Sequence, residues 1–213
     1  ITTTGTGGAG TIAHGLGAVP HLIISKGRSN SGGWVVYHHG NTGAPQTDAL
    51  NLATNGATVD AVAFFNDTSP TSSVFTVGTT NDVNGDGRTY VHYVFTEIQG
   101  YSKFGNYTGD GNGDGPFLYT GFKPRWVMFK RTDAAEEWYI YDTERDPINV
   151  MDRKLFADIN NAEQQSETLD FLSNGVKLRN TSTAFNANGG TYVYIAFAEH
   201  PFVSSKGVPV TAR

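Results

Sequence analysis

Hydrophobic residues occur along this chain in short runs, and stretches rich in Gly, Asn, Ser and Thr separate these runs. Short apolar runs between turn-forming residues are typical of β-strands, whereas helices need longer periodic segments. Many helix-forming residues occur only between positions 150 and 171, where we expect short helical turns. The pattern predicts an all-β fold with little helix, and the predicted strands are residues 21–25, 33–37, 59–65, 73–77, 90–95, 117–119, 125–129, 138–141, 175–178 and 192–197.

The second half of the chain repeats the pattern of the first half. The segment VPHLIISKG matches KPRWVMFKR 104 positions later, and TYVHYVFTE matches TYVYIAFAE 102 positions later. A repeat of this length predicts two tandem, duplicated β-sandwich-like modules of about five or six strands each, at residues 1–100 and 101–213. The identical pairs that support the repeat include Pro20 and Pro124, Lys26 and Lys130, Trp34 and Trp138, Tyr37 and Tyr141, and Glu97 and Glu199.

Alternation within one predicted strand suggests which of its faces is buried, because successive side chains of a strand point to opposite faces. Val91, Tyr93 and Phe95 share one face, which we expect to lie in the core. The other face carries Tyr90 and His92 and is more polar. The runs LIIS and WVMF are apolar on both faces, as expected of a central strand that is covered on both sides.

Composition and charge exclude several classes of partner. Twenty acidic and fifteen basic residues give a net charge of -5, and the basic residues form no cluster, so we expect no nucleic-acid partner. No segment has eighteen consecutive apolar residues, so we expect no membrane insertion, and the first residues do not resemble a secretion signal. The absence of cysteine excludes disulfides and cysteine-based zinc sites.

Two segments, DVNGDG and DGNGDG, resemble the beginning of a calcium-binding loop. Neither segment has the carboxylate that such a loop needs eleven residues after its first ligand, and neither acidic pattern occurs at the matching place in the other half. Asn-Gly and Asp-Gly pairs also favour tight turns. We therefore expect turns and no metal, with weak calcium sites as the alternative; their candidate ligands are Asp82, Asn84, Asp86, Asp110, Asn112 and Asp114.

Other motifs give no sign of a cofactor or an active site. Gly5, Gly7 and Gly10 fit the GxGxxG pattern, but neither a strand before them nor a helix after them is predicted, so we expect a flexible leader and no cofactor. His38 and His39 are adjacent, would point to opposite faces of a strand and cannot easily share one metal ion.

Carboxylate pairs of the kind that hydrolyse glycosides were considered as well. Glu97 and Glu199 occupy equivalent positions of the repeat, which favours a structural role at a strand end. Asp133, Glu136 and Glu137 precede a predicted strand and are expected to form a solvent-exposed loop. We therefore expect no enzymatic activity.

The sequence resembles a repeated module of tailed-bacteriophage proteins. The segments GYSKFGNYTGDGNGDGPFLYTGFKPRWVMFKR, WYIYDTERDP, DFLSNGVKLR and GGTYVYIAFAEHPF carry this resemblance in the second half, and AHGLGAVPHLIISKGRSNSGGWVVYHHG carries it in the first. Proteins with this module are often described as tail fibres or virion structural proteins. The resemblance implies a location on the virion surface and identifies no functional residue.

A tail-fibre or receptor-binding role implies contact with a bacterial surface polysaccharide, whose sugar rings stack on aromatic side chains. The candidates for this contact are Tyr101, Tyr107 and Tyr119, while Trp34 and Trp138 are expected in the core. The alternatives are a capsid decoration or other extracellular assembly protein and, third, a polysaccharide depolymerase. In either structural role we expect contacts with other virion subunits and a homo-oligomer, with a trimer favoured.

Overall fold

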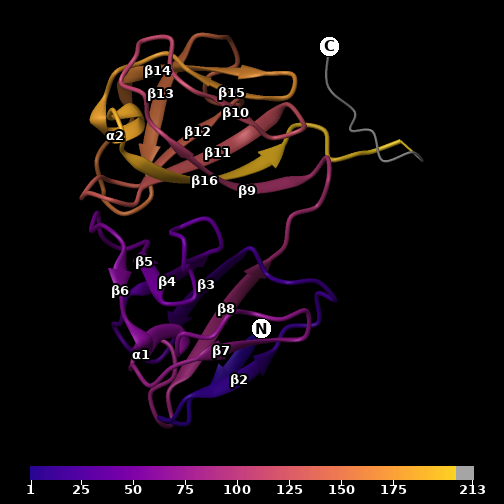
Figure 1. Ribbon diagram of the computed structural model, residues 1–213, viewed down its shortest axis with the longest axis vertical. Coiled ribbons are helices and arrows are strands. Elements are labelled where there is room, and N and C mark those ends of the chain that lie inside the picture. The colour runs from indigo at the N-terminus through magenta and orange to yellow at the C-terminus, as the bar shows by residue number, and fades with distance from the viewer. Residues whose placement is uncertain (205–213) are drawn as a thin grey trace. The chain divides into compact units, whose positions relative to one another are not determined.

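The computed structural model describes residues 1–204, which form two compact units, Ile1–Thr96 and the part of the chain from Glu97 onward (Figure 1). Nearly all regular structure is β, and the two helices are single turns. The predicted all-β fold is confirmed. Within residues 1–204, no helix is both long and apolar enough to cross a membrane. The last nine residues of the predicted second module lie outside the described part of the chain.

The first unit contains one six-stranded antiparallel sheet, in the order β1-β8-β3-β4-β5-β6, and a two-stranded sheet of β2 and β7. Its core cluster includes Ile23, Tyr37, Phe65 and Phe75. The elements of this unit are β1 (Thr2–Thr4), β2 (Gly10–Ala13), β3 (Leu22–Gly27), β4 (Trp34–His38), β5 (Asp48–Asn51), β6 (Val59–Asp60), α1 (Val62–Phe65), β7 (Val74–Val77) and β8 (Thr89–Phe95).

The second unit is built on one eight-stranded antiparallel sheet, in the order β10-β15-β14-β13-β12-β11-β16-β9, which curls into a nearly closed barrel (Figure 1). Phe129, Tyr141 and Phe185 belong to the cluster that fills it. The elements are β9 (Ser102–Thr108), β10 (Phe117–Tyr119), β11 (Pro124–Arg131), β12 (Tyr139–Asp142), β13 (Met151–Phe156), β14 (Gln164–Leu172), β15 (Gly175–Leu178), α2 (Thr183–Asn186) and β16 (Thr191–Ala198).

The two units pair their strands in the same register. Three antiparallel ladders of the first unit recur in the second when the sequence offsets of 104 and 102 are applied. These correspondences link whole ladders and not only similar segments, so the repeat seen in the sequence is also a repeat of structure. The matching pairs are Leu22 with His38 and Trp126 with Asp142; Leu22 with Phe95 and Trp126 with Phe197; and Thr4 with Thr89 and Thr108 with Thr191.

The helical turns expected between residues 150 and 171 are wrong, because this segment forms most of β13 and β14. Met151, Leu169 and Phe171 point into the barrel core, and burial of these side chains outweighs the helix propensity of their neighbours. The helical turns lie elsewhere. One of them, α1, occupies part of the strand predicted at residues 59–65.

The buried face predicted for β8 is also wrong. Tyr90 and His92 are 0 % and 1 % exposed, whereas Tyr93 is 46 % exposed. The polar atoms of the buried side chains are satisfied inside the unit: the Tyr90 hydroxyl donates to the Asn81 carbonyl at 2.7 Å, and the His92 ring nitrogens meet two hydroxyls. Polar groups can be buried when they are hydrogen-bonded, so the face of β8 that carries Tyr90 and His92 lies in the core although it is the more polar one.

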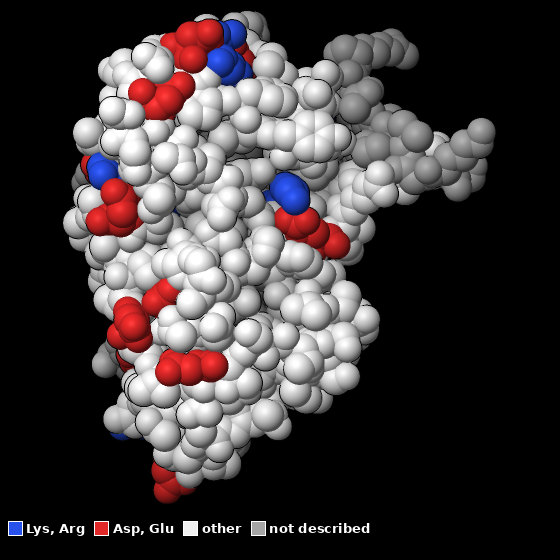
Figure 2. Space-filling view, viewed as in Figure 1, with Lys and Arg blue, Asp and Glu red and all other residues white. Residues whose placement is uncertain are grey.

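Charged side chains are sparse on the face shown in Figure 2. On the face shown in Figure 2, acidic and basic side chains form small separate groups between wide uncharged areas, and basic residues form no continuous patch there.

Candidate functional site

The eight-stranded sheet of the second unit has two edges, β9 and β10, and its nearly closed shape leaves a seam between them. Tyr194 of β16 spans this seam: its ring lies against Gly105 of β9, and its hydroxyl donates to the Tyr119 carbonyl of β10 at 3.1 Å. A Cβ atom on Gly105 would lie 2.4 Å from the ring, so only glycine leaves room for this crossing.

A hollow of about 370 Å³ opens beside this crossing, and we call it the seam hollow. Its size is within the range of small-ligand sites. The lining combines one aromatic side chain with short polar groups and backbone: Glu97, Gln99, Gly100, Ser102, Lys103, Tyr119, Thr120 and Gly121.

Three polar side chains of the seam hollow, Glu97, Ser102 and Lys103, are held in place by bonds within the protein. Glu97 accepts a hydrogen bond from the Phe104 backbone N–H at 3.1 Å and forms an ion pair with Lys103 at 2.8 Å. The Ser102 hydroxyl accepts from the Ile98 backbone N–H at 3.1 Å. Glu97 thus satisfies a backbone donor of the edge strand β9 and presents a fixed carboxylate beside a fixed ammonium group.

Of the three tyrosines expected to contact a ligand, only Tyr119 lines this hollow. Its side chain is 64 % exposed, and its ring lies near Gly121, whose φ of +82° favours glycine. Tyr101 is 43 % exposed but lies outside the lining and contacts Phe197 edge-to-face, with ring centroids 5.8 Å apart. Two exposed tyrosines of one unit therefore differ in whether they border a hollow.

Tyr107, the third candidate for ligand contact, is half-buried in the structure. Tyr107 belongs to β9, stacks on Tyr192 with ring centroids 4.8 Å apart, and donates its hydroxyl to the Phe185 carbonyl at 2.9 Å. Burial raises the pKa of the Tyr107 hydroxyl well above its ordinary value. This side chain packs against the core cluster and stacks on the Tyr192 ring.

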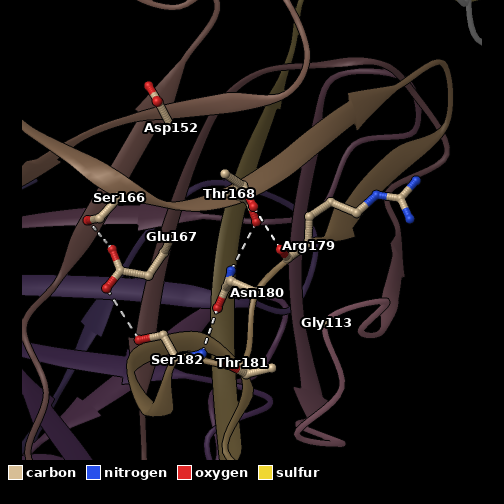
Figure 3. A pocket seen from close by; sticks show the side chains of 9 residues that line it. All are labelled: Gly113, Asp152, Ser166, Glu167, Thr168, Arg179, Asn180, Thr181 and Ser182. Atoms are coloured by element: carbon tan, nitrogen blue, oxygen red, sulfur yellow. Dashed lines mark hydrogen bonds between the residues drawn. The ribbon is translucent and has the colours of Figure 1, made fainter.

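A second hollow, of about 520 Å³, lies beside β13, β14, β15 and the α2 turn (Figure 3), and we call it the polar hollow. It has no aromatic lining. Figure 3 shows Glu167 of β14 between the hydroxyls of Ser166 and Ser182, with Asp152 on the neighbouring strand β13. The lining residues are Gly113, Asp152, Ser166, Glu167, Thr168, Arg179, Asn180, Thr181 and Ser182.

Glu167 is held in its ionised form. Ser166 and the buried Lys154 both donate to its Oε2, and Ser182 donates to Oε1 at 3.3 Å. Burial acts to raise the pKa of this carboxyl, but these donors and the Lys154 charge outweigh it, and the pKa is lowered. The carboxylate therefore serves as an acceptor rather than as an acid that releases a proton near neutral pH.

The second of the two calcium-like segments, DGNGDG, connects β9 to β10. It is held by the buried side chain of Asn186, the last residue of α2. The Asn186 amide donates to the Asp110 carboxylate at 3.1 Å and to the Asn112 carbonyl at 2.8 Å, and it accepts from the Asp110 N–H at 2.8 Å. Asp114 pairs with Lys177 at 3.1 Å and with Arg179 at 2.5 Å. Both carboxylates of this segment, Asp110 and Asp114, thus already have protein partners.

In the first segment, DVNGDG, the buried asparagine lies inside the segment and bonds to other parts of the unit. Asn84, which occupies the position equivalent to Asn186, is buried and accepts from the Thr6 N–H at 3.1 Å while it donates to the Gly78 carbonyl at 3.1 Å. Asp82 accepts from the Gly33 N–H at 3.3 Å. Asp86 forms no hydrogen bond or ion pair within residues 1–204. The two units thus share a buried asparagine, Asn84 or Asn186, at the same position of the repeat.

The glycine-rich start of the chain is not the flexible leader that was expected. Thr2–Thr4 forms β1, Gly10 begins β2, and between them the Gly5 N–H donates to the Arg88 carbonyl at 2.8 Å. These glycines allow the backbone to approach its neighbour closely, because a Cβ on Gly5 would lie 2.2 Å from the Gly85 carbonyl oxygen.

The remaining carboxylate candidates do not converge on one site. Glu199 pairs with Lys123 at 2.8 Å, as its equivalent Glu97 pairs with Lys103. The loop from Asp133 to Glu137 is not simply solvated: Asp133 forms two bonds to the Arg131 guanidinium, at 2.9 and 3.1 Å, and Glu136 accepts from the Tyr139 hydroxyl at 3.3 Å.

The aromatic and histidine candidates are placed mainly by packing. Trp138 is buried, as expected, whereas Trp34 is half-buried and lies 5.8 Å from the Lys26 ammonium. His38 is buried while its neighbour His39 is half-buried. Within residues 1–204, no three His, Asp or Glu side chains are grouped in a way that could hold a metal ion.

Comparison with known proteins identifies the family of this chain. A family model described as "Domain of unknown function (DUF7483)" matches residues 1–201. The chain belongs to this family. No curated protein and no solved structure matches the chain. The matched range covers both units, so the two repeats together make up one DUF7483 domain.

Sequence reasoning missed most of the residues that line the two hollows of this DUF7483 domain. Gln99, Ser102 and Lys103 follow a strand and carry no motif, and Asp152 and Glu167 lie where helical turns were expected. The shared asparagine had a signal, because Asn84 and Asn186 are identical residues at the 102-residue offset.

Proposed function

We propose that this protein is a non-enzymatic structural protein of a bacteriophage particle and that its second unit binds a saccharide of the host surface in the seam hollow. The particle context comes from the sequence resemblance. The observation that supports binding is Tyr119, an exposed aromatic ring at a hollow whose other lining groups are polar. An aromatic face packs on the C–H face of a sugar, while fixed polar groups bond its hydroxyls.

The charged pair of the seam hollow suits a hydroxyl-rich, uncharged ligand. Glu97 offers acceptor capacity and Lys103 offers donors, and the two charges compensate each other at 2.8 Å. Because the Phe104 N–H and Lys103 hold Glu97 in one geometry, little side-chain freedom is lost when a ligand binds. A sugar ring, which has both donor and acceptor hydroxyls, matches this arrangement.

The lining favours binding over hydrolysis. Glycoside hydrolysis generally uses two carboxyl groups, one of which acts as an acid with a raised pKa. Glu97 supplies the one carboxyl group in the lining, and it is paired with a cation. The depolymerase alternative is therefore weaker, and release of reducing sugar from host polysaccharide by the purified protein would revive it.

The test compares Tyr119→Ala with Tyr101→Ala, which removes an exposed tyrosine of the same unit outside the hollow. We expect the wild-type protein to bind host cells and to lose this binding after the surface carbohydrate is stripped. Loss of one aromatic contact of about 0.5–1.5 kcal/mol predicts affinity weakened about twofold to twelvefold for Tyr119→Ala. The Tyr101→Ala variant should bind like the wild type. Equal effects of the two substitutions would contradict the proposal.

The position of the chain on an intact particle separates the two structural roles. Labelled antibodies against the protein should mark the tail if it contacts the host receptor. Labelling confined to the head would favour capsid decoration instead.

A further inference from the structure

We propose that the polar hollow is a second, separate binding site, for a saccharide that carries a protonated amine. No residue lines both hollows. This site therefore does not depend on the seam hollow. The inference follows from which hydrogen-bonding atoms and which charges the polar hollow leaves for a ligand.

Three of the four hydroxyl groups that line the polar hollow already donate their protons within the protein. Ser166 and Ser182 donate to Glu167, and Thr168 donates to the Arg179 carbonyl at 2.7 Å. A hydroxyl that has donated its proton can offer a ligand only its oxygen lone pairs. The Asn180 amide nitrogen uses one of its two protons in a bond to the Thr168 carbonyl at 3.0 Å.

Two carboxylates add to this set of acceptors. Glu167 is ionised, and its Oε1 receives one long bond of 3.3 Å from Ser182, which leaves acceptor capacity. Within residues 1–204, the Asp152 carboxylate forms no hydrogen bond or ion pair. Thr181 is the one lining hydroxyl of the described chain without a bonded partner. The hollow thus presents many acceptors and few donors, and its ligand must supply the donors.

The charges give the ligand its sign. Lys154 compensates Glu167, and Arg179 is bound to Asp170 at 2.7 Å and to Asp114. Figure 3 shows the Arg179 guanidinium directed away from Glu167 and Asp152, so it does not offset either carboxylate. Asp152 remains as one uncompensated negative charge. An acidic sugar would be repelled, whereas an amine beside Asp152 would supply both charge and donors.

The volume of about 520 Å³ is sufficient for a saccharide rather than a lone amine. Hydroxyl donors of the sugar can reach Glu167 and the serine oxygens while its ammonium group pairs with Asp152. This arrangement distinguishes an amino sugar with a free amine from its N-acetylated form, which has lost the charge.

The test is titration of the full ¹⁵N-labelled chain at pH 6 with a tetramer of β-1,4-linked glucosamine, alongside the fully N-acetylated tetramer. We expect the free-amine tetramer to shift the amide signals of Ser166, Thr168 and Thr181, and the acetylated tetramer to bind at least about tenfold more weakly. Asp152→Asn should weaken binding of the free-amine tetramer by about tenfold as well.

Two control variants make the result specific. Asp67→Asn removes one exposed negative charge from the first unit and should leave affinity unchanged, which excludes a general effect of net charge. Tyr101→Ala should also leave it unchanged, because Tyr101 lines neither hollow. Equal affinity for both tetramers, preference for a glucuronate oligomer, no effect of Asp152→Asn, or no binding would each overturn the inference without bearing on the seam hollow.

Discussion

Lowering the pH from 7 to 5 should destabilise the first unit through His92. Its ring is 1 % exposed, lies 5.3 Å from the Phe75 ring, and has Ser25 and Thr3 hydroxyls 2.8 and 3.0 Å from its two nitrogens. A neutral ring has one donor and one acceptor nitrogen, and two hydroxyls can match both. Burial lowers the pKa of His92 from 6.5 to about 4, and the nearby Ile1 ammonium adds to this effect.

The magnitude follows from the difference between the folded and unfolded pKa values. Between pH 6.5 and pH 4 the unfolded chain binds a proton at this histidine and the folded unit does not, so falling pH favours unfolding. The expected loss in free energy of unfolding is about 2 kcal/mol from pH 7 to pH 5 and about 3 kcal/mol below pH 4. Typical domains have about 5–15 kcal/mol in total, so the effect is measurable.

The assay is urea unfolding at several pH values, followed by NMR signals assigned to each unit. Asp158 of the second unit gives the opposite trend, because burial and the neighbouring Glu137 raise its pKa to about 6, and protonation below that pH favours the folded state. Measuring the units separately keeps these effects apart. The His92→Gln variant has donor and acceptor groups but no titration, so it should lose the pH dependence, while His14→Gln should retain it.

Direct titration of the His92 ring signals by NMR can refute this prediction. A midpoint near 6.5 in the folded protein would contradict the burial argument. The same conclusion would follow if His92→Gln lost as much stability on acidification as the wild type.

The remaining predictions concern the second unit and the assembly. Gly105→Ala should destabilise the second unit by about 1–3 kcal/mol in thermal or urea unfolding, because the new methyl meets the Tyr194 ring, whereas Gly113→Ala, which has open space around it, should be neutral. Asn186→Ala should lower the free energy of unfolding by about 2 kcal/mol or more, because buried loop groups lose their hydrogen-bond partner. The exposed Asn112→Ala should lower it little, and equal effects would contradict the role of Asn186 in holding the loop. Millimolar calcium should change neither the melting temperature nor the amide signals of the DxNxDG segments, and a saturable shift would restore a calcium site. Light scattering should give three times the chain mass, and a monomer at micromolar concentration would refute the expected trimer.

Local sequence patterns could predict many of the strands and the equivalence of the two halves, but not β1, β2, β5 or β9. Short apolar runs between turn residues depend on neighbours in sequence, and the repeated Trp, Tyr and Lys positions fix which strands correspond. The segment 150–171 could not be read in this way. Its helix-forming residues belong to β13 and β14 because Leu169 and Phe171 are needed in the barrel core, which is a tertiary requirement.

The hollows could not be predicted for a related reason. The seam hollow exists because β9 and β10 do not pair after the sheet curls, and nothing local to Lys103 or Tyr119 indicates that these edges lie close together. The buried face of β8 was missed because hydrophobicity alone ranks His92 and Tyr90 as the outer side chains. Their burial depends on hydrogen-bond partners that are distant in sequence, such as Ser25.

The most direct test of saccharide binding at the seam is chemical-shift mapping on the ¹⁵N-labelled chain, titrated with neutral oligosaccharides from the host surface. The account predicts saturable shifts of the Gln99, Lys103, Thr120 and Gly121 amides, with affinity that falls for Tyr119→Ala and not for Tyr101→Ala. Saturable shifts that leave these four amides unmoved, or no shift with any host oligosaccharide, would contradict it.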